Sequence, residues 1–118
     1  MEHSETTAVD HFLTEFKVKL KIWNVIFWSD RQKNTQTMAE LEISVNDAIA
    51  VLEDLSLEDY SQGPLLDQML NGADMWVFGK EVKGNEIYIK VTLGRVSNPV
   101  ICISFHFAEY PMNYPLKS

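Results

Sequence analysis

The segment Ala73–Glu109 reads ADMWVFGKEVKGNEIYIKVTLGRVSNPVICISFHFAE, and it determines the fold class of this chain. It predicts three strands, which cover residues 74–82, 86–93 and 100–107. The turns between them, at 83–85 and 94–99, consist of residues that readily adopt turn backbone angles. The segment therefore predicts an antiparallel three-stranded meander.

Apolar and polar residues alternate along the second and third of these strands. The apolar set is Ile87, Ile89, Val91, Leu93, Ile101, Ile103, Phe105 and Phe107. A period of two indicates a sheet with one buried face. A shift of the pairing by one residue would turn this set toward solvent, so burial restricts the register.

Three registers of the second and third strands keep both apolar sets on one face. The central register places Tyr88 opposite His106 and Lys90 opposite Ser104, and the other two are shifted by two residues in either direction. In all three registers a tyrosine, a lysine, a serine and a histidine lie together on the less apolar face.

The first turn leaves the partner of Tyr88 on the first strand open. A three-residue loop would place Lys80 opposite Tyr88, whereas a two-residue loop would place Glu81 there. In the first case Lys80 joins the polar face.

The length of 118 residues favours one domain over residues 1–118. A hydrophobic content of 46% and a charged content of 23% are ordinary for a globular protein. No apolar window is long enough to span a bilayer, no secretory signal is visible, and the single cysteine, Cys102, excludes an internal disulfide. We therefore expect a cytoplasmic protein with no membrane segment.

The net charge of −7 is concentrated in the first part of the chain. Residues 1–70 contain 5 Lys or Arg against 13 Asp or Glu, whereas residues 71–118 contain 5 against 4. Proteins that bind nucleic-acid duplexes show a basic footprint, so we expect no direct DNA binding. A small catalytic pocket or a basic protein partner is compatible with this charge.

Two helices are expected before the meander. The first follows a frayed, polar stretch at 1–7, begins near Ala8 and is capped by Thr6 or Thr7. The second begins at Ser44, where Asp47 completes a capping box. The apolar stripes of the two helices are Val9, Phe12, Leu13, Phe16 and Leu20, and Ile49, Leu52 and Leu55 with Ala48 at the border.

The other segments connect these helices to the sheet. Residues 22–28 predict a short strand against the main sheet, and residues 29–36 predict a polar loop followed by one helical turn at 37–41. Residues 60–64 predict a break that leads toward the sheet, and residues 110–118 predict an extended, docked C-terminal tail. We therefore expect an α+β fold in which two N-terminal helices pack on an antiparallel β-sheet.

The less apolar sheet face carries the candidate chemistry. The chain has no phosphate-binding glycine loop, no nucleophile elbow, no zinc-type cysteine pair and no histidines at metal-ligand spacing, so we expect no metal site. A histidine can donate or accept a proton near neutral pH, a lysine can stabilise phosphoryl charge, and a tyrosine can orient a ribose or stack on a base. This set suits RNA cleavage, and the alternative is an ordinary amphipathic sheet face.

The region also resembles a known family. The sequence is similar to the MqsR family of bacterial type II toxins, which are RelE-like mRNA interferases, over Trp76–Thr92 and Val100–His106. The shared pattern is a strand with a tryptophan, then a glycine turn followed by Tyr-φ-Lys (φ apolar), then an apolar strand that ends in Ser-Phe and a basic residue. The helix that ends at residues 55–60 extends the resemblance to residues 45–107. The resemblance implies a RelE-like α+β fold, metal-independent and cofactor-free mRNA cleavage, and neutralisation by an antitoxin. Such antitoxins commonly carry a helix-turn-helix DNA-binding part, and often a zinc-binding part.

The resemblance also assigns residues. Tyr88 matches the active-site tyrosine of the family, and His106 stands where the best-known member has a catalytic lysine. Two family positions are not matched. The position of an active-site lysine of the family falls near Ser61 or Gln62 in this sequence, and Val77 stands where the family has a glutamine after the tryptophan.

Two functional hypotheses follow. The first is an endoribonuclease in which Lys80 or Arg31 replaces the missing cation. Its expected catalytic residues are His106, Tyr88, Lys80 and Lys90, and its expected RNA contacts are Arg31, Lys33, Trp76 and Ser104. The second is a catalytically inactive RelE-like module that binds or regulates a protein partner. Beside these two, a weaker alternative is a small regulatory protein whose tyrosine- and proline-rich tail docks on another subunit.

Overall fold

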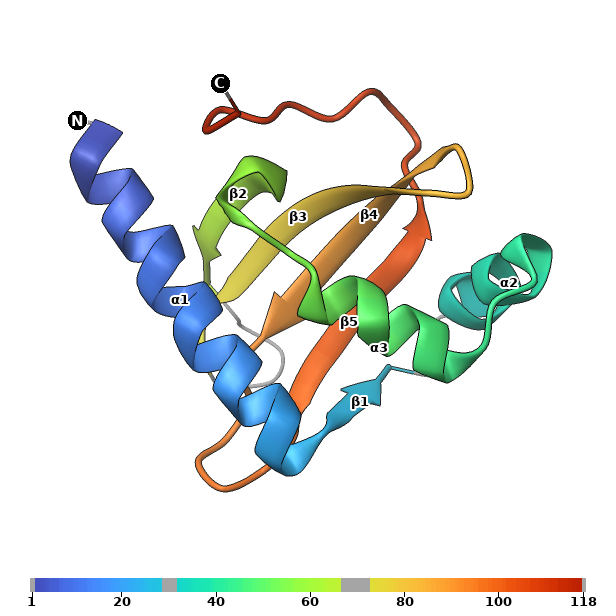
Figure 1. Cartoon of the computed structure of the whole chain (residues 1–118), viewed down its shortest axis with the longest axis horizontal. Helices are drawn as coiled ribbons and strands as arrows, with labels where there is room; N and C mark the ends of the chain where they lie inside the picture. The colour runs from blue at the N-terminus through green and yellow to red at the C-terminus, as the bar shows by residue number, and fades with distance from the viewer. Residues whose placement is uncertain (1, 29–31, 67–72, 118) are drawn as a thin grey trace.

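The computed structural model describes residues 2–28, 32–66 and 73–117. Within these ranges the chain forms three α-helices, one 3-10 turn and five strands (Figure 1). In chain order they are α1 (Glu2–Trp23), β1 (Val25–Phe27), α2 (Gln32–Leu41), α3 (Val45–Glu53), η1 (Leu57–Asp59), β2 (Tyr60–Leu65), β3 (Met75–Val82), β4 (Asn85–Thr92) and β5 (Val100–Phe107). None of the described helices is long and apolar enough to cross a membrane.

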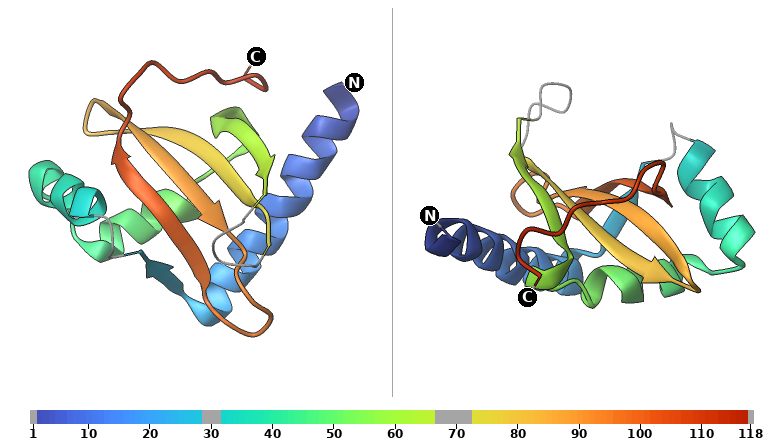
Figure 2. Two further views of the ribbon diagram at one scale, coloured as in Figure 1. Left: turned by 180° about the vertical axis from the view of Figure 1, so that it is seen from behind. Right: turned by 90° about the horizontal axis from the view of Figure 1, so that it is seen from above.

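The five strands form one sheet in the order β1-β5-β4-β3-β2. All neighbours are antiparallel except β1 and β5, which are parallel. Helices α1 and α3 cover one face of this sheet, and α2 lies beside β5 (Figure 2). The α+β class and the packing of N-terminal helices on the sheet are confirmed, with a third helix that the sequence did not predict as such.

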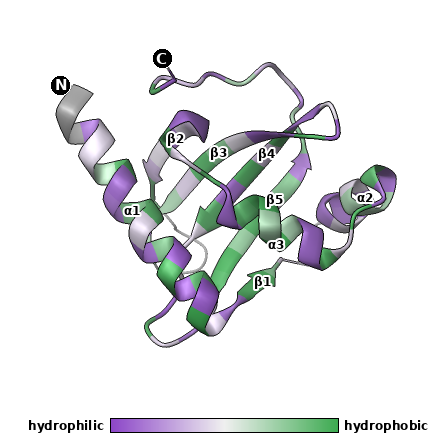
Figure 3. Ribbon diagram, in the orientation of Figure 1, coloured by the Kyte–Doolittle hydropathy of each residue, from purple (hydrophilic) through white to green (hydrophobic). Residues whose placement is uncertain are grey.

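The hydrophobic core lies between α1, α3 and the covered face of the sheet. Its buried apolar residues come from the two helices and from the central strands. Figure 3 shows hydrophobic segments along β3, β4 and β5. The five predicted stripe residues of α1 are buried. In α3 Ala48 and Leu52 are buried and Ile49 is only partly buried, while Leu55, which was predicted in the same stripe, is buried just beyond the end of the helix. The Ser44–Asp47 capping box is confirmed by hydrogen bonds of 2.9 and 3.0 Å in the two directions.

The β3–β4 hairpin differs from both predicted registers. Its turn contains only Lys83 and Gly84, which have positive φ angles of 51° and 82°, as in the tight turns that suit the twist of a hairpin. Gly79 is therefore the residue opposite Tyr88, and Lys80 is opposite Ile87. Because paired residues share a face, Lys80 lies on the helix-covered side of the sheet.

The β4–β5 pair has the predicted central register, with Tyr88 opposite His106 and Lys90 opposite Ser104. Beyond Lys90 the register shifts, so that Val91 pairs with Cys102. This irregularity corrects the predicted alternation: Cys102 enters the core, and Ile101 moves to the polar face opposite Thr92. A one-residue bulge changes the face of every residue beyond it.

Helix α2 replaces most of the predicted polar loop. Residues 32–36 are helical, residues 37–41 continue the same helix, and residues 29–31 lie outside the described residues. The reason is Asn34, which is only 2% exposed and whose amide donates to the carbonyls of Trp28 and Ile103 and accepts from the N–H of Phe105. This polar side chain joins α2 to the bulged part of β5, a role that its residue type does not reveal.

Two further boundaries differ from prediction. Helix α1 begins at Glu2, so residues 2–7 form its first turns, and Thr6 and Thr7 lie within the helix instead of capping it. The predicted break at 60–64 is the edge strand β2, which pairs with β3. An edge strand tolerates glycine and proline because one of its sides makes no ladder hydrogen bonds.

Candidate active site

A cleft lies on the sheet face opposite α1 and α3, and its volume is about 510 Å³. Its floor is formed by Tyr88 and Lys90 of β4 with Ser104 and His106 of β5. Residues 61–62 of β2 form one side, Lys33 of α2 lies at the rim, and residues 109–113 form the opposite wall. The structure thus brings together four polar residues that the alternation placed on one face.

The imidazole of His106 is held by two neighbours. Its ring stacks on Tyr88, with 5.2 Å between the ring centroids and 9° between the ring planes. Its Nδ1 lies 3.1 Å from the carbonyl oxygen of Phe107. A carbonyl oxygen can only accept a hydrogen bond, so Nδ1 carries the proton, and Nε2 is the nitrogen that remains for a substrate.

Ser104 contributes a buried hydroxyl to the same floor. The residue is 1% exposed, and its Oγ has no hydrogen-bond partner among the described residues. A buried polar atom without a partner costs about 1–3 kcal/mol. Such an atom at the base of a cleft is typical of a site where a ligand supplies the missing hydrogen bond.

At the rim, Lys33 and Glu109 form an ion pair with 2.8 Å between Nζ and Oε2. The hydrogen bond and the charge of Lys33 lower the pKa of the Glu109 carboxyl, and a positive charge on His106 acts in the same direction. Both residues also line a second hollow of about 240 Å³ beside α2, together with His106. The predicted RNA contact Lys33 is therefore at the cleft, but on a helix and already paired with a carboxylate.

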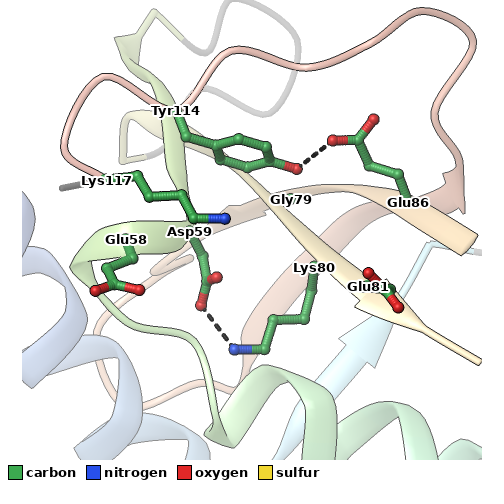
Figure 4. Close-up of a pocket in the computed structure, with 8 residues that line it drawn as sticks. All are labelled: Glu58, Asp59, Gly79, Lys80, Glu81, Glu86, Tyr114 and Lys117. Atoms are coloured by element: carbon green, nitrogen blue, oxygen red, sulfur yellow. Dashed lines mark hydrogen bonds and ion pairs between the residues drawn. The ribbon is translucent and has the colours of Figure 1, made fainter. Parts of the chain in front are cut away.

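Lys80, which was predicted to be catalytic, does not line the cleft. Its Nζ lies 2.9 Å from a carboxylate oxygen of Asp59 and 3.2 Å from one of Asp54 (Figure 4 shows the pair with Asp59). Burial lowers the pKa of Lys80, but its hydrogen bonds to these two carboxylates outweigh that effect and raise it. Lys80 is thus a structural cation between β3 and the segment that follows α3.

A second predicted contact, Trp76, does not line the cleft. Trp76 is 9% exposed and stacks on Phe12 in the core with a centroid distance of 4.9 Å, so its ring cannot receive a base. Arg31 lies outside the described residues. Ser61 and Gln62, near which the resemblance to MqsR toxins places a family lysine, do line the cleft, but their side chains are neutral.

The C-terminal segment is the part of the site that sequence reasoning missed. Residues 109–113 form a wall of the cleft, and beyond them Tyr114 donates a hydrogen bond of 2.5 Å to Glu86 across Gly79 (Figure 4). A Cβ atom on Gly79 would lie 2.2 Å from the Tyr114 hydroxyl oxygen and 2.8 Å from the Met112 sulfur. A glycine inside a strand often marks a place where another segment approaches the backbone closely. Gly79 was therefore the one signal in the sequence that a segment packs against this strand.

No group of three or more His, Cys, Asp or Glu side chains in the described ranges is arranged to hold a metal ion. Comparisons with protein-family models, curated protein sequences and solved structures produced no match to this chain. The resemblance to MqsR toxins is therefore a prediction from the motifs around Trp76, Tyr88 and Ser104.

Proposed function

We propose that this chain is the toxin component of a type II toxin–antitoxin system, with a RelE-like fold and a metal-independent, cofactor-free endoribonuclease activity on mRNA. The observation that supports this best is the convergence of Tyr88, Lys90, Ser104 and His106 on one cleft. Its volume of about 510 Å³ lies within the range of about 300–1,000 Å³ that is common for ligand pockets. Its proposed partners are an RNA substrate and, in the cytoplasm, an antitoxin with a helix-turn-helix part.

The proposed reaction uses the RNA 2′-hydroxyl as the nucleophile on the adjacent phosphorus. His106 performs one of the two required proton transfers through Nε2, and the Tyr88 ring holds the imidazole plane. Lys90 is paired with Ser104 across β4 and β5, so a phosphate above this pair meets the ammonium N–H donors of Lys90, while the Ser104 hydroxyl is buried. These donors stabilise the charge that develops on the phosphoryl oxygens.

The test is cleavage of a labelled single-stranded RNA of mixed sequence by the purified chain. We expect His106→Ala to lower kcat/KM by about 100-fold or more, the usual contribution of one proton-transfer group. The matched control is His11→Ala, because His11 is an exposed histidine on α1, away from the cleft. Equal cleavage by wild type and His106→Ala would remove His106 from the mechanism, and no cleavage by the wild type would overturn the ribonuclease proposal.

A second candidate function is a binding module without catalysis. It is favoured by the neutral Ser61 and Gln62 at the family lysine position and by the pairing of Lys80 with two aspartates away from the cleft. It predicts that the wild-type chain binds the same RNA, or a protein partner, without cutting RNA. RNA binding measured beside cleavage separates the two functions.

A further inference from the structure

We propose that Glu109 is the second proton-transfer residue of this cleft: its carboxylate accepts the proton of the RNA 2′-hydroxyl, and His106 protonates the leaving 5′-oxygen. This inference rests on the proposed ribonuclease function and assigns its two proton transfers to two named side chains. Sequence reasoning had placed Glu109 after the strand predicted at 100–107, with no role.

The first argument is the inventory of acids and bases in the cleft. Cleavage of RNA through its 2′-hydroxyl requires one group that accepts a proton and one that donates a proton. Among the described residues that line the cleft, only the imidazole of His106 and the carboxylate of Glu109 belong to classes that exchange protons readily near or below neutral pH. The remaining lining residues are lysines, tyrosines and neutral side chains, whose ordinary pKa values are far higher or which do not titrate.

The second argument is position. Glu109 follows the end of β5 by two residues, so its carboxylate and the His106 imidazole leave the same short segment of chain. The N–H of Ala108 donates to the carbonyl of Glu86 at 2.9 Å, which anchors the backbone beside Glu109. Both Glu109 and His106 line the cleft and also the hollow of about 240 Å³ beside it. An RNA strand that occupied both hollows would therefore pass beside Glu109 and His106.

The third argument is the charge state of Glu109. The titratable side chains that line the same two hollows as Glu109 are Lys33 and Glu40 of α2, Tyr88 and Lys90 of β4, His106 of β5, and Tyr110. Lys33 contacts the carboxylate at 2.8 Å and lowers the pKa of this carboxyl below its ordinary value, so Glu109 is ionised at neutral pH. An ionised carboxylate is the form that can accept a proton, and the lysines offset its repulsion of a phosphate.

The step balances without any further reagent. The O–H bond of the 2′-hydroxyl breaks and its proton moves to the Glu109 carboxylate, while O2′ forms a bond to phosphorus. The bond between phosphorus and O5′ breaks, and O5′ takes the proton from the His106 imidazolium. The products are a 2′,3′-cyclic phosphate and a 5′-hydroxyl, after which Glu109 loses its proton to water and His106 regains one.

The experiment compares pH profiles of kcat/KM for wild type, Glu109→Gln and Lys33→Gln on the labelled RNA, from about pH 4 to about pH 9. We expect the wild type to show a bell-shaped pH profile and to leave 2′,3′-cyclic phosphate ends on the cleaved RNA. In Glu109→Gln we expect kcat/KM to fall by about 100-fold or more and the acidic limb of the profile to disappear. Lys33→Gln removes the cation that lowers the Glu109 pKa, so its acidic limb should move to higher pH. The matched control is Glu53→Gln, an exposed carboxylate on α3.

The outcomes separate the two proposals. Wild-type cleavage that depends on His106, together with an acidic limb unmoved in Glu109→Gln and in Lys33→Gln, overturns the role of Glu109 and leaves the ribonuclease standing. A wild-type chain that does not cleave RNA overturns both. A lower kcat/KM in Glu109→Gln with an unchanged profile shape would assign Glu109 to binding or structure, and would equally overturn its role in proton transfer.

Discussion

Replacing Asn34 by alanine should destabilise the fold through the bulged part of β5. The Asn34 amide makes three hydrogen bonds: it donates to the carbonyls of Ile103 and Trp28, at 3.0 and 3.1 Å, and accepts from the N–H of Phe105 at 2.9 Å. Ile103 and Phe105 are 2% and 0% exposed, so their backbone groups would lose a partner where water has little access.

The magnitude follows from these orphaned groups. Each buried donor or acceptor left without a partner costs about 1–3 kcal/mol, so the loss of the two buried bonds gives about 2–6 kcal/mol. Domains of this size have a free energy of unfolding of about 5–15 kcal/mol, so the variant should still fold. Because Asn34 is next to Lys33, and Phe105 is next to His106, we also expect lower RNA cleavage.

The assay is urea unfolding followed by tryptophan fluorescence, with hydrogen exchange of the Phe105 amide as the local measurement. The matched control is Asn46→Ala, an exposed asparagine on α3, which should change the free energy of unfolding by no more than about 0.5 kcal/mol. The reasoning is refuted if the free energy of unfolding of Asn34→Ala lies within about 1 kcal/mol of the wild-type value and the Phe105 amide exchanges no faster. The Asn34 side chain would then not be needed as the hydrogen-bond partner of the buried backbone groups at the bulge.

Three further predictions concern the cleft wall and the residues that the structure removes from the site. Gly79→Ala should displace the C-terminal segment, because the new Cβ would lie 2.2 Å from the Tyr114 hydroxyl oxygen; faster hydrogen exchange of the Met112 amide checks this, and unchanged exchange contradicts it. Lys80→Met should cost about 1–3 kcal/mol of stability, because Asp59 loses a partner, yet leave kcat/KM for RNA within about threefold; a loss of about 100-fold would restore Lys80 to catalysis. The pKa of Lys80 is raised above its ordinary value of 10.5. The contribution of Lys80 to the free energy of unfolding is therefore complete below pH 10.5 and is lost only as the pH rises through the higher pKa of the folded state. The difference in free energy of unfolding between wild type and Lys80→Met should stay constant from about pH 6 to about pH 9.

The assignment of Glu109 bears on the departures from the family pattern. If the resemblance to MqsR toxins holds, the family lysine position falls near the neutral Ser61 or Gln62 in this chain, and His106 stands where the best-known member has a catalytic lysine. A site that transfers protons through the His106 imidazole and the Glu109 carboxylate needs no lysine at either of these two positions for proton transfer. The measured pH profile would therefore also test whether this chain replaces lysine-based chemistry or has lost it.

Local patterns in the sequence were sufficient for the elements that have one buried face. Period-two alternation predicted β4 and β5, and burial of that face restricted their register to choices that include the observed pairing of Tyr88 with His106. The Ser44–Asp47 capping box is likewise a local signal, because its partners are three residues apart. The polar face of the cleft floor was predictable for the same reason.

The three-dimensional arrangement decided what depends on contacts between distant segments. A turn of two residues at Lys83–Gly84 sets the β3 register, and it moved Lys80 to the helix side of the sheet. Asn34 reads as a loop residue until its contacts with the β5 bulge, about 70 positions further along the chain, are known. The sequence by itself therefore determined that β4 and β5 form and that Tyr88, Lys90, Ser104 and His106 share a face, because the alternation that indicates this depends on neighbours two to four positions apart. Only the tertiary structure decided which cations reach the cleft and that Glu109 faces it, because those depend on turn geometry, a bulge and the path of the C-terminal segment.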